Sequence, residues 1–304
     1  MPFSYHSHSG QFCHHGYGKL EDVVKQAIRK GFKVYGLSEH MPRFDSNHLY
    51  PEEIQANCTT STLATAYSAF LVEARRLQEV YKDQIELLIG AEIEFIDPSY
   101  ANHVRDLRKS HTIDYVVGSL HHTHSIPIDF SPELYQHALE HIGKGKLDAL
   151  FKAYFDEQYK MLLSVKPEVV GHFDLIRIFA DQTKASVALN QPEVWEAVVR
   201  NVDFVVSYGG VFEINSRAWK KGLLDAYPQR EIIKLIQSKG GKFTLSDDCH
   251  GPNDVGMFYD KLHQYLKDTG IKNIHYLTKR NGAVAVEELE DIVTDPFWAK
   301  IEHW

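Results

Sequence analysis

The sequence of 304 residues has few cysteines and no long apolar run, and each shortage excludes a class of protein. Its three cysteines, Cys13, Cys58 and Cys249, are an odd number in a long chain. They exclude a disulfide framework and fit a reducing compartment. No apolar stretch is long enough to span a bilayer. The N-terminus lacks a charged segment followed by an apolar one, which argues against a secretory signal. We therefore expect a soluble, cytoplasmic protein.

Positive charge is also scarce. The chain has 33 Lys and Arg against 41 Asp and Glu, a net charge of −8, and no basic run of five or more residues. Nucleic-acid binding usually needs a basic field, so we expect neither nucleic acid nor a membrane as a partner. The hydrophobic fraction of 43% can fill a sizeable core. The length suits one large α/β domain or two smaller ones.

Histidine, by contrast, is abundant: 18 residues, clustered instead of scattered. His6 and His8 occupy alternate positions near the start of the chain. On a strand, alternate side chains point to the same face. Two imidazoles on one face at a strand end are the beginning of a metal site. A purification-tag remnant is the alternative, but helix-like amphipathic sequence follows directly.

The chain alternates between strand and helix patterns. We expect helices near 20–28, 63–81, 100–109, 147–164, 192–201 and 230–239, and strands or apolar segments at 32–37, 85–92, 113–120, 167–171, 204–206, 211–214 and 242–245. The tail from residue 251 resembles helix, strand and short helix. We see no linker or internal repeat and predict one α/β domain over residues 1–304, a β/α barrel. Loop insertions near 41–62 and 123–146 are either functional or tolerated surface loops.

Residues that bind metals follow almost every expected strand. In parallel α/β layers, sites form at the carboxyl ends of the strands. The residues at these ends are His40, Glu92, His121, His172 with Asp174, and Asp247 with His250. One such histidine is usually structural, but repetition at five strand ends favours a multinuclear site. Imidazole with carboxylate suits Zn, Fe or Mn. Clustered divalent ions activate water and hold both oxygens of a phosphoryl displacement, so we expect phosphate-ester hydrolysis.

Six short motifs along the chain resemble those of the polymerase and histidinol phosphatase (PHP) superfamily. They are His6-Ser7-His8, Ser38-Glu39-His40, Gly90-Ala91-Glu92-Ile93-Glu94, Val117-Gly118-Ser119-Leu120-His121, Gly171-His172-Phe173-Asp174 and Ser246-Asp247-Asp248-Cys249-His250. The stretch from Gly171 to Arg177, with Glu213-Ile214-Asn215-Ser216 later, is similar to the monofunctional histidinol-phosphatase branch. The resemblance runs from His6 to His250.

This resemblance implies a distorted (β/α)₇ barrel with three divalent metal ions, either Zn, Mn or Fe. It implies hydrolysis of L-histidinol phosphate to L-histidinol and phosphate, in histidine biosynthesis, with a metal-bridging hydroxide as nucleophile. Carried over by position, the ligands of the three ions are His6, His8, Glu92 and Asp247; Glu92, His121 and His172; and His15, His40 and His250. Asp247, His250 and Arg177 are the implied catalytic residues, with Asp247 orienting the nucleophile.

Phosphate recognition requires cations, and arginine suits it through bidentate geometry. The resemblance places Arg177 on the phosphate, with a salt bridge on the barrel rim as the structural alternative. The position of the branch's second arginine holds Lys220, while Arg217 lies three residues earlier. Either could serve, and Asn215 joins them as a predicted substrate-binding residue.

Several neighbouring residues compete for the same roles. His15 is preferred to His14 because a glycine follows it, and His121 is preferred to His122 and His124 because it directly follows the strand. Glu39, Glu94 and Asp174 are candidates to orient metal-bound histidines. The stretches 44–50, with Asp45 and His48, and 126–130, with Asp129, are candidates to hold an imidazole. A nucleotide phosphoesterase, an exonuclease-like domain and a metal-binding protein without turnover are the alternative functions.

Overall fold

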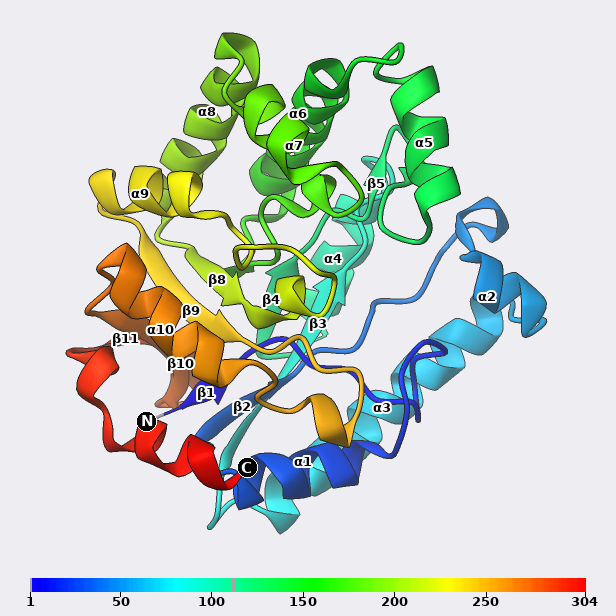
Figure 1. Ribbon diagram of the computed structural model, residues 1–304. Helices are drawn as coiled ribbons and strands as arrows, with labels where there is room; N and C mark the ends of the chain where they lie inside the picture. The colour runs from blue at the N-terminus through cyan, green and yellow to red at the C-terminus, as the bar shows by residue number, and fades with distance from the viewer. Residues whose placement is uncertain (1, 111–112) are drawn as a thin grey trace.

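A curled parallel sheet forms the centre of the computed structural model, which describes residues 2–110 and 113–304 (Figure 1). Within these residues the sheet has seven strands, and every neighbouring pair runs parallel. Their order is β1 (Phe3–Ser4), β2 (Val34–Leu37), β3 (Glu86–Ile93), β4 (Tyr115–Gly118), β7 (Val169–Val170), β8 (Val211–Asn215) and β9 (Lys242–Ser246). The sheet nearly closes on itself, which confirms the predicted distorted (β/α)₇ barrel.

The barrel is closed by contacts just beyond the ends of β1 and β9. Ser7 and Cys249 form an isolated parallel bridge, and the backbone N–H of His8 donates to the carbonyl of Cys249 at 2.7 Å. Nearby, Ser4 Oγ donates to Asp247 Oδ1 at 2.8 Å. The first and last strands of the sheet therefore meet at the edge where the predicted ligands lie.

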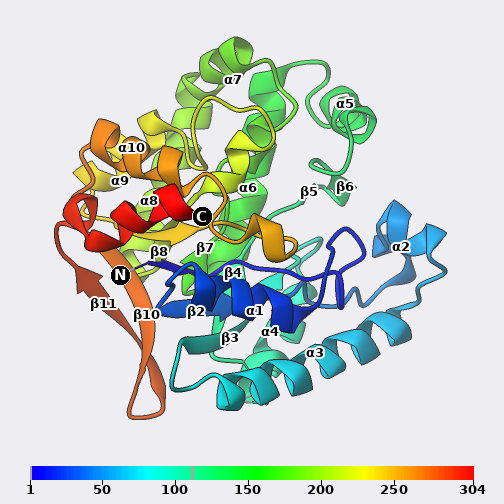
Figure 2. The ribbon, with the colours of Figure 1, turned by 60° about the horizontal axis from the view of Figure 1, so that its bottom comes forward.

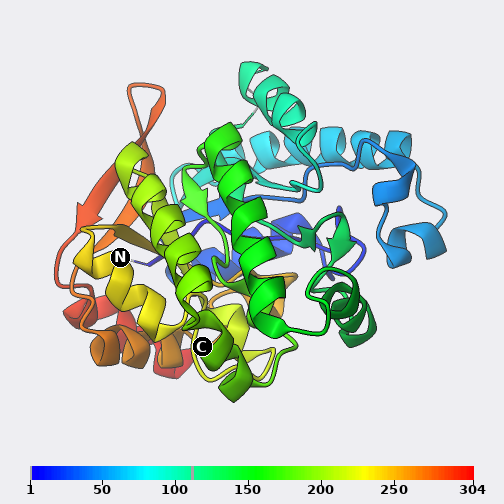
Figure 3. The same cartoon turned by 90° about the horizontal axis from the view of Figure 1, so that it is seen from above.

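Helices pack around the outside of the sheet (Figures 1 and 3). They are α1 (Leu20–Arg29), α2 (Pro51–Gln55), α3 (Thr60–Val80), α4 (Tyr100–Lys109), α5 (Pro132–His141), α6 (Leu147–Val165), α7 (Gln182–Leu189), α8 (Pro192–Tyr208), α9 (Arg230–Ser238) and α10 (Tyr259–Thr269). Short 3₁₀ helices are η1 (Ser46–His48), η2 (Leu175–Arg177), η3 (Ser216–Trp219), η4 (Pro252–Asp254), η5 (Ile292–Thr294) and η6 (Pro296–His303). No helix among the described residues is long and apolar enough to cross a membrane.

The helix pattern corrects one expectation. The apolar segment at 204–206 belongs to α8, because Val198, Val202 and Val205 continue the buried face of that helix at helical spacing. The α-helix α7, with a weak apolar pattern, was not expected from the sequence.

Two glycines make room inside the barrel for one tyrosine. A Cβ on Gly36 of β2 would lie 2.1 Å from the hydroxyl oxygen of Tyr115, and a Cβ on Gly90 of β3 would lie 2.5 Å from its ring. The Tyr115 hydroxyl donates to the carbonyl of Tyr5 at 2.7 Å. Glycine is therefore needed on both strands so that this buried ring can pack against the backbone.

The two expected insertions contain secondary structure. Residues 41–62 include η1 and α2, and residues 123–146 include α5 and part of a small hairpin, β5 (His122–Thr123) with β6 (Ile126–Pro127). Both insertions extend to the right of the sheet in Figure 1. The prediction of a single domain over residues 1–304 stays a prediction.

The C-terminal part of the chain adds an antiparallel hairpin beside β9, made of β10 (Ile274–Arg280) and β11 (Ala283–Leu289) (Figure 2). The Tyr5 hydroxyl donates to the carbonyl of Leu277 at 2.8 Å and accepts from its N–H at 2.7 Å. This pair of bonds attaches the hairpin to the start of the chain.

Candidate metal centre

One buried carboxylate, Glu92 at the end of β3, lies at the centre of the site. It is 1% exposed, and five imidazoles from four segments of the chain surround it. Its oxygens lie 2.9–3.2 Å from His6 Nε2, His8 Nε2, His40 Nδ1, His121 Nε2 and His172 Nε2. The structure thus brings together predicted ligands from the ends of β1, β2, β3, β4 and β7.

Further carboxylates hold the outer nitrogens of these rings. Glu213 Oε2 lies 3.1 Å from His6 Nδ1, and Glu94 Oε2 lies 3.2 Å from His121 Nδ1. Glu39 Oε2 lies 3.4 Å from His8 Nδ1, while its other oxygen accepts from the backbone N–H of Ser9. A carboxylate on one ring nitrogen fixes the orientation of an imidazole and leaves the other nitrogen for a metal.

Several buried atoms of the cluster lack a well-formed hydrogen bond, and they are of the types that bind a divalent cation. Buried nitrogens of His6, His8, His40 and His172 and buried oxygens of Glu92 and Glu94 make no hydrogen bond of acceptable geometry among the described residues. Leaving such groups buried and unsatisfied is costly. Ligand atoms lie within 4.8 Å of one another in the groups His6–His8–Asp248, His6–Glu92–His172, His8–His40–His250 and Cys13–His15–His40. These residues fit metal ions.

The carboxylates and imidazoles of the cluster shift one another's pKa values toward the charged forms. Burial opposes the charged form of His6, but Asp248, Glu92 and Glu213 raise its pKa well above the usual value. Burial likewise opposes ionisation of Glu92, yet His6, His121 and His40 lower its pKa well below the usual range. The carboxylates therefore attract positive charge strongly, and a divalent cation can supply that charge in place of protons.

Asp247, a predicted ligand, belongs to none of the ligand groups found among the described residues. Its carboxylate accepts hydrogen bonds from Ser4 Oγ, the Tyr35 hydroxyl and the backbone N–H of Gly256, and it lies in the gap between β1 and β9. Burial raises the pKa of this carboxyl to about 6. Its neighbour Asp248 faces the cluster instead, with Oδ1 at 3.7 Å from His6 Nε2 and 3.9 Å from His8 Nε2.

The backbone explains the exchange between the two aspartates. Asp248 has φ = 46°, a left-handed conformation, and is the second residue after the end of β9. This conformation interrupts the alternation of the strand, so the second aspartate of the pair points to the cluster. Asn215 Nδ2 donates to Asp248 Oδ2 at 3.1 Å and to Glu213 Oε1 at 2.8 Å. Asn215 thus positions the carboxylates, whereas the sequence predicted a substrate contact.

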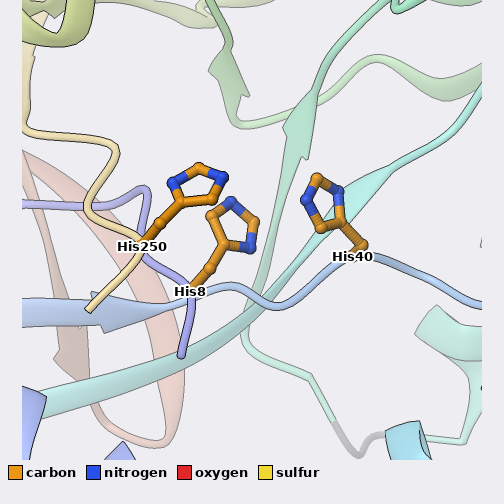
Figure 4. A group of neighbouring side chains, drawn as sticks. All are labelled: His8, His40 and His250. Atoms are coloured by element: carbon orange, nitrogen blue, oxygen red, sulfur yellow. The ribbon is translucent and has the colours of Figure 1, made fainter. Parts of the chain in front are cut away.

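The outer histidines lie beside the Glu92 cluster. Figure 4 shows His8, His40 and His250 on three separate segments of the chain. The ring centroid of His8 is 4.2 Å from that of His40 and 4.6 Å from that of His250. His15 Nε2 lies 3.2 Å from His40 Nε2. All three members of the predicted third ligand set are therefore neighbours.

The competing histidines lie outside the cluster. His14 Nε2 is 3.0 Å from Cys58 Sγ, and exposed His124 lies 3.6 Å from Glu157 Oε1. His122 is buried beside the ring of Tyr50, and burial lowers its pKa to about 3. The preference for His15 and His121 over these neighbours agrees with the geometry.

A cavity of about 340 Å³ opens above the cluster. Its floor includes Glu92, His121, His172, Asp248 and His250, and its walls carry Tyr50, Phe130, Leu175, Ile178 and Tyr227. The charged side chains at its rim are Glu52, Asp129, Arg217 and Lys221. The two stretches predicted to hold an imidazole, 44–50 and 126–130, supply Tyr50 and Phe130 to the cavity walls. Asp45 and His48 do not line the cavity.

Arg177 is not among the residues that line this cavity, and its phosphate contact stays a prediction. Its Nε donates to Asp174 Oδ2 at 2.7 Å, and its Nη2 donates to the carbonyls of Asp225 and Ala226. The guanidinium also lies 4.9 Å from the ring centroid of Tyr227. Arg177 and Asp174 therefore form a buried ion pair behind the cavity wall, and Asp174 does not orient a histidine.

The cations that do line the cavity are Arg217 and Lys221. Lys220, the second candidate, points away and forms an ion pair with Asp254 at 2.8 Å. Arg217 Nη1 donates to the carbonyl of Asp248 at 3.0 Å. Lys221 makes no ion pair within the part of the chain that the structure describes, and burial together with Arg217 lowers its pKa. Two neighbouring cations raise the local positive potential, which attracts anions.

Sequence reasoning overlooked several residues of the site. Glu213 precedes Asn215 by two positions on β8, so both side chains lie on the same face of the strand. This alternation was a signal for Glu213. Lys221 adjoins the chosen lysine, and the sequence offers no means of choosing between them. Cys13 lies two residues before His15, the same spacing as between His6 and His8, and this spacing was a signal for Cys13.

Comparison with known proteins identifies relatives over the whole chain. The family model described as PHP domain matches residues 4–217. The probable histidinol-phosphatase of Schizosaccharomyces pombe is 45% identical over 303 residues, which cover 99% of this chain and 97% of that protein. The histidinol-phosphatase of Saccharomyces cerevisiae is 35% identical over 334 aligned residues, with 98% and 99% coverage.

A solved structure shares the fold. The crystal structure of histidinol phosphate phosphatase from Lactococcus lactis, in complex with zinc, L-histidinol and phosphate, superposes with a TM-score of 0.65. The alignment covers 93% of this chain and 98% of that one, at 20% sequence identity. At this identity the likeness establishes the architecture of the barrel.

Proposed function

The chain belongs to the PHP domain family, and on this premise we propose that it is a histidinol-phosphatase, a metal-dependent phosphomonoesterase. The proposed reaction is hydrolysis of L-histidinol phosphate to L-histidinol and phosphate, as a step of histidine biosynthesis. The observation that carries the proposal is the Glu92 cluster at the floor of a cavity whose rim bears Arg217 and Lys221. Two full-length relatives named for this activity support it.

Three divalent ions are proposed, with one change from the sequence-based ligand set. The ligand sets are His6, His8, Glu92 and Asp248; Glu92, His121 and His172; and His15, His40 and His250. The imidazole and carboxylate donors suit Zn, Mn or Fe. When bound, such ions lower the pKa of coordinated water, and the metal-bridging hydroxide remains the proposed nucleophile.

The chain's own carboxylates prepare these ligands. Glu213 and Glu94 each lie beside the Nδ1 of a proposed ligand and so orient the ring with its opposite nitrogen, Nε2, toward Glu92. Asn215 orients Asp248 by donating a hydrogen bond to its carboxylate. His250 lines the cavity, and burial lowers its pKa well below the usual value. Arg217 lies close enough to contribute to this decrease.

Arg217 and Lys221 are the proposed phosphate contacts. Arg217 lies on η3, and Lys221 is the second residue after it. Asn215 caps η3 by accepting from the backbone N–H of Arg217 at 2.9 Å. The cavity is also lined by two aromatic rings and a carboxylate: Tyr50, Phe130 and Asp129. Aromatic faces and a carboxylate suit the imidazole and ammonium of histidinol, so these three residues are the proposed contacts of that part of the substrate.

A substrate panel tests the assignment. Purified protein loaded with Zn, Mn or Fe is assayed for phosphate release from L-histidinol phosphate, a nucleoside monophosphate and a generic aryl phosphate, with elemental analysis of the same samples. We expect hydrolysis of histidinol phosphate to exceed that of the other esters by at least about 100-fold in kcat/KM, equivalent to roughly 2.7 kcal/mol of selective binding. A flat profile from metal-loaded protein would contradict the proposal.

A further inference from the structure

A cysteine accompanies the outer histidines, and neither the family resemblance nor the relatives assign it a role. Ligand atoms of Cys13, His15 and His40 lie within 4.8 Å of one another. Cys13 is 7% exposed, whereas the His15 side chain is 40% exposed. The group therefore lies where the Glu92 cluster meets the solvent, with its sulfur on the buried side.

The turn that carries Cys13 is held rigidly. Its backbone N–H donates to the carbonyl of Ser9 at 2.9 Å, and its own carbonyl accepts from Gly16 at 3.2 Å. Ser9 is fixed in turn by Glu39 Oε1, which accepts from both its N–H and its hydroxyl. A Cβ on Gly16 would lie 2.8 Å from the backbone of Ser9, so the turn leaves no room for a side chain there. The sulfur is thus preorganised beside the imidazoles.

The two imidazoles are arranged as ligands of one ion. His15 Nε2 and His40 Nε2 lie 3.2 Å apart. Two nitrogens bound to one tetrahedral zinc, each about 2.05 Å away, would be separated by about 3.3 Å. Glu52 Oε1 lies 3.3 Å from His15 Nδ1 and orients the ring so that Nε2 faces the group. Glu52 serves His15 as Glu94 serves His121.

We propose that Cys13 binds the third ion through its sulfur, together with His15, His40 and His250. On binding, the S–H bond is replaced by a sulfur–metal bond and one proton passes to the solvent. A thiolate is a soft ligand, and soft ligands favour zinc over manganese. Cys13 would therefore make the third position selective for zinc, while the Glu92 positions, with nitrogen and oxygen donors only, would accept harder ions. The inference rests on the proposed metal dependence and extends it.

Cobalt substitution tests the sulfur ligand directly. The whole protein is stripped of metal, loaded with Co²⁺ and examined by absorption spectroscopy. We expect a sulfur-to-cobalt charge-transfer band in the near ultraviolet for the natural chain and for Cys58→Ser, and its loss in Cys13→Ser. Cys58 is the matched control because its sulfur contacts His14 outside the group. A cobalt-loaded natural chain without this band overturns the inference, whether or not the Cys13 variant folds.

Metal retention gives a second measurement that does not depend on turnover. After dialysis against a graded chelator, zinc per chain is measured by elemental analysis. In Cys13→Ser the affinity for one zinc ion should fall by at least about tenfold, with manganese retention unchanged. Equal zinc retention by Cys13→Ser and the natural chain contradicts the inference alone. A natural chain that binds none of cobalt, zinc, manganese and iron contradicts the proposed function as well.

Discussion

At the scale of single residues, two adjacent aspartates have separate tasks. Asp247 is surrounded by donors from Ser4, Tyr35 and Gly256 and joins the first strand to the last. Asp248 turns toward His6 and His8 and is held by Asn215. Both are buried, yet only Asp248 has a position from which it could bind a metal. Substitution of each to asparagine keeps the size of the side chain and separates the two tasks.

Asp248→Asn should lose metal and activity while it keeps its fold. Replacement of a residue that only orients a ligand typically lowers metal affinity or activity about 10- to 100-fold. The loss of a direct ligand should therefore lower kcat/KM by at least about 100-fold. Asp247→Asn should retain metal but lose about 1–3 kcal/mol of unfolding free energy, because an amide cannot accept from all three donors. Elemental analysis, phosphate release and urea unfolding of both variants check this. The reverse pattern would restore the original assignment of Asp247.

Two adjacent lysines allow an equally direct comparison. Lys221 lines the cavity beside Arg217, while Lys220 is paired with Asp254. Lys221→Ala should raise KM for histidinol phosphate by about 10- to 100-fold, since a hydrogen bond to a charged group contributes about 1.5–3 kcal/mol. Lys220→Ala, the matched control, should change KM by less than about threefold because exposed ion pairs contribute little. Steady-state kinetics measure both, and equal effects would mean that Lys221 does not contact the phosphate.

At the scale of elements, the segments that follow the strands define the cavity. The insertion with α2 supplies Tyr50 and Glu52, and the stretch before α5 supplies Asp129 and Phe130. The segment after β8 supplies Arg217 and Lys221, and the segment after β9 supplies Asp248 and His250. The strands hold the proposed ligands in place, and these connecting segments determine what else enters the site.

One hydroxyl attaches the hairpin of β10 and β11 to the other end of the chain. Tyr5→Phe removes both hydrogen bonds to Leu277 in a fully buried position. The variant should lose about 2–4 kcal/mol of unfolding free energy, since two backbone groups lose their partner. Metal content should not change. Urea unfolding measures the loss, with Tyr276→Phe as the control, because that hydroxyl pairs with Glu287 on a half-buried strand. A loss no larger than that of the control would contradict this role of Tyr5.

At the scale of the whole molecule, the barrel and the proposed metal cluster depend on each other. The ligand-bearing segments extend from His6 to His250, and the first and last of them meet where β1 and β9 are joined by few hydrogen bonds. Metal ions shared among these segments would connect strands that the sheet connects only weakly. Ions that bind only the native state also stabilise it in proportion to the logarithm of their concentration over Kd.

Metal removal should therefore weaken the whole fold. At a free concentration of 100 times its Kd, one ion contributes about 2.7 kcal/mol to the free energy of unfolding. Treatment with a chelator should lower Tm by at least about 5 °C, measured by calorimetry. Asp248→Asn, which lacks one ligand from the start, should show a smaller decrease on chelation. An unchanged Tm for the natural chain would mean that the cluster binds no stabilising metal.

Much of the architecture follows from local patterns. Alternation of strand and helix predicted the barrel, and His or Glu at successive strand ends predicted a site at one edge of the sheet. Glu92, with five imidazoles around it, occupies the position that this reasoning expected. The strand and helix pattern failed at residues 204–206. The sequence predicted a helix that ends near residue 201 and a separate apolar segment, but α8 continues through both.

The sequence by itself determined which strand ends carry ligands, because the period of a strand and the position of its last residue are local properties. Only the tertiary structure decided which of two neighbours faces the site. The left-handed backbone at Asp248 reverses the choice between the aspartates, and the turn after η3 directs Lys221 inward and Lys220 outward. Arg177 is drawn to Asp174 and to backbone carbonyls that lie far from it in sequence. A difference of one residue rotates a side chain to the opposite side, and that rotation depends on partners that only the folded chain brings together.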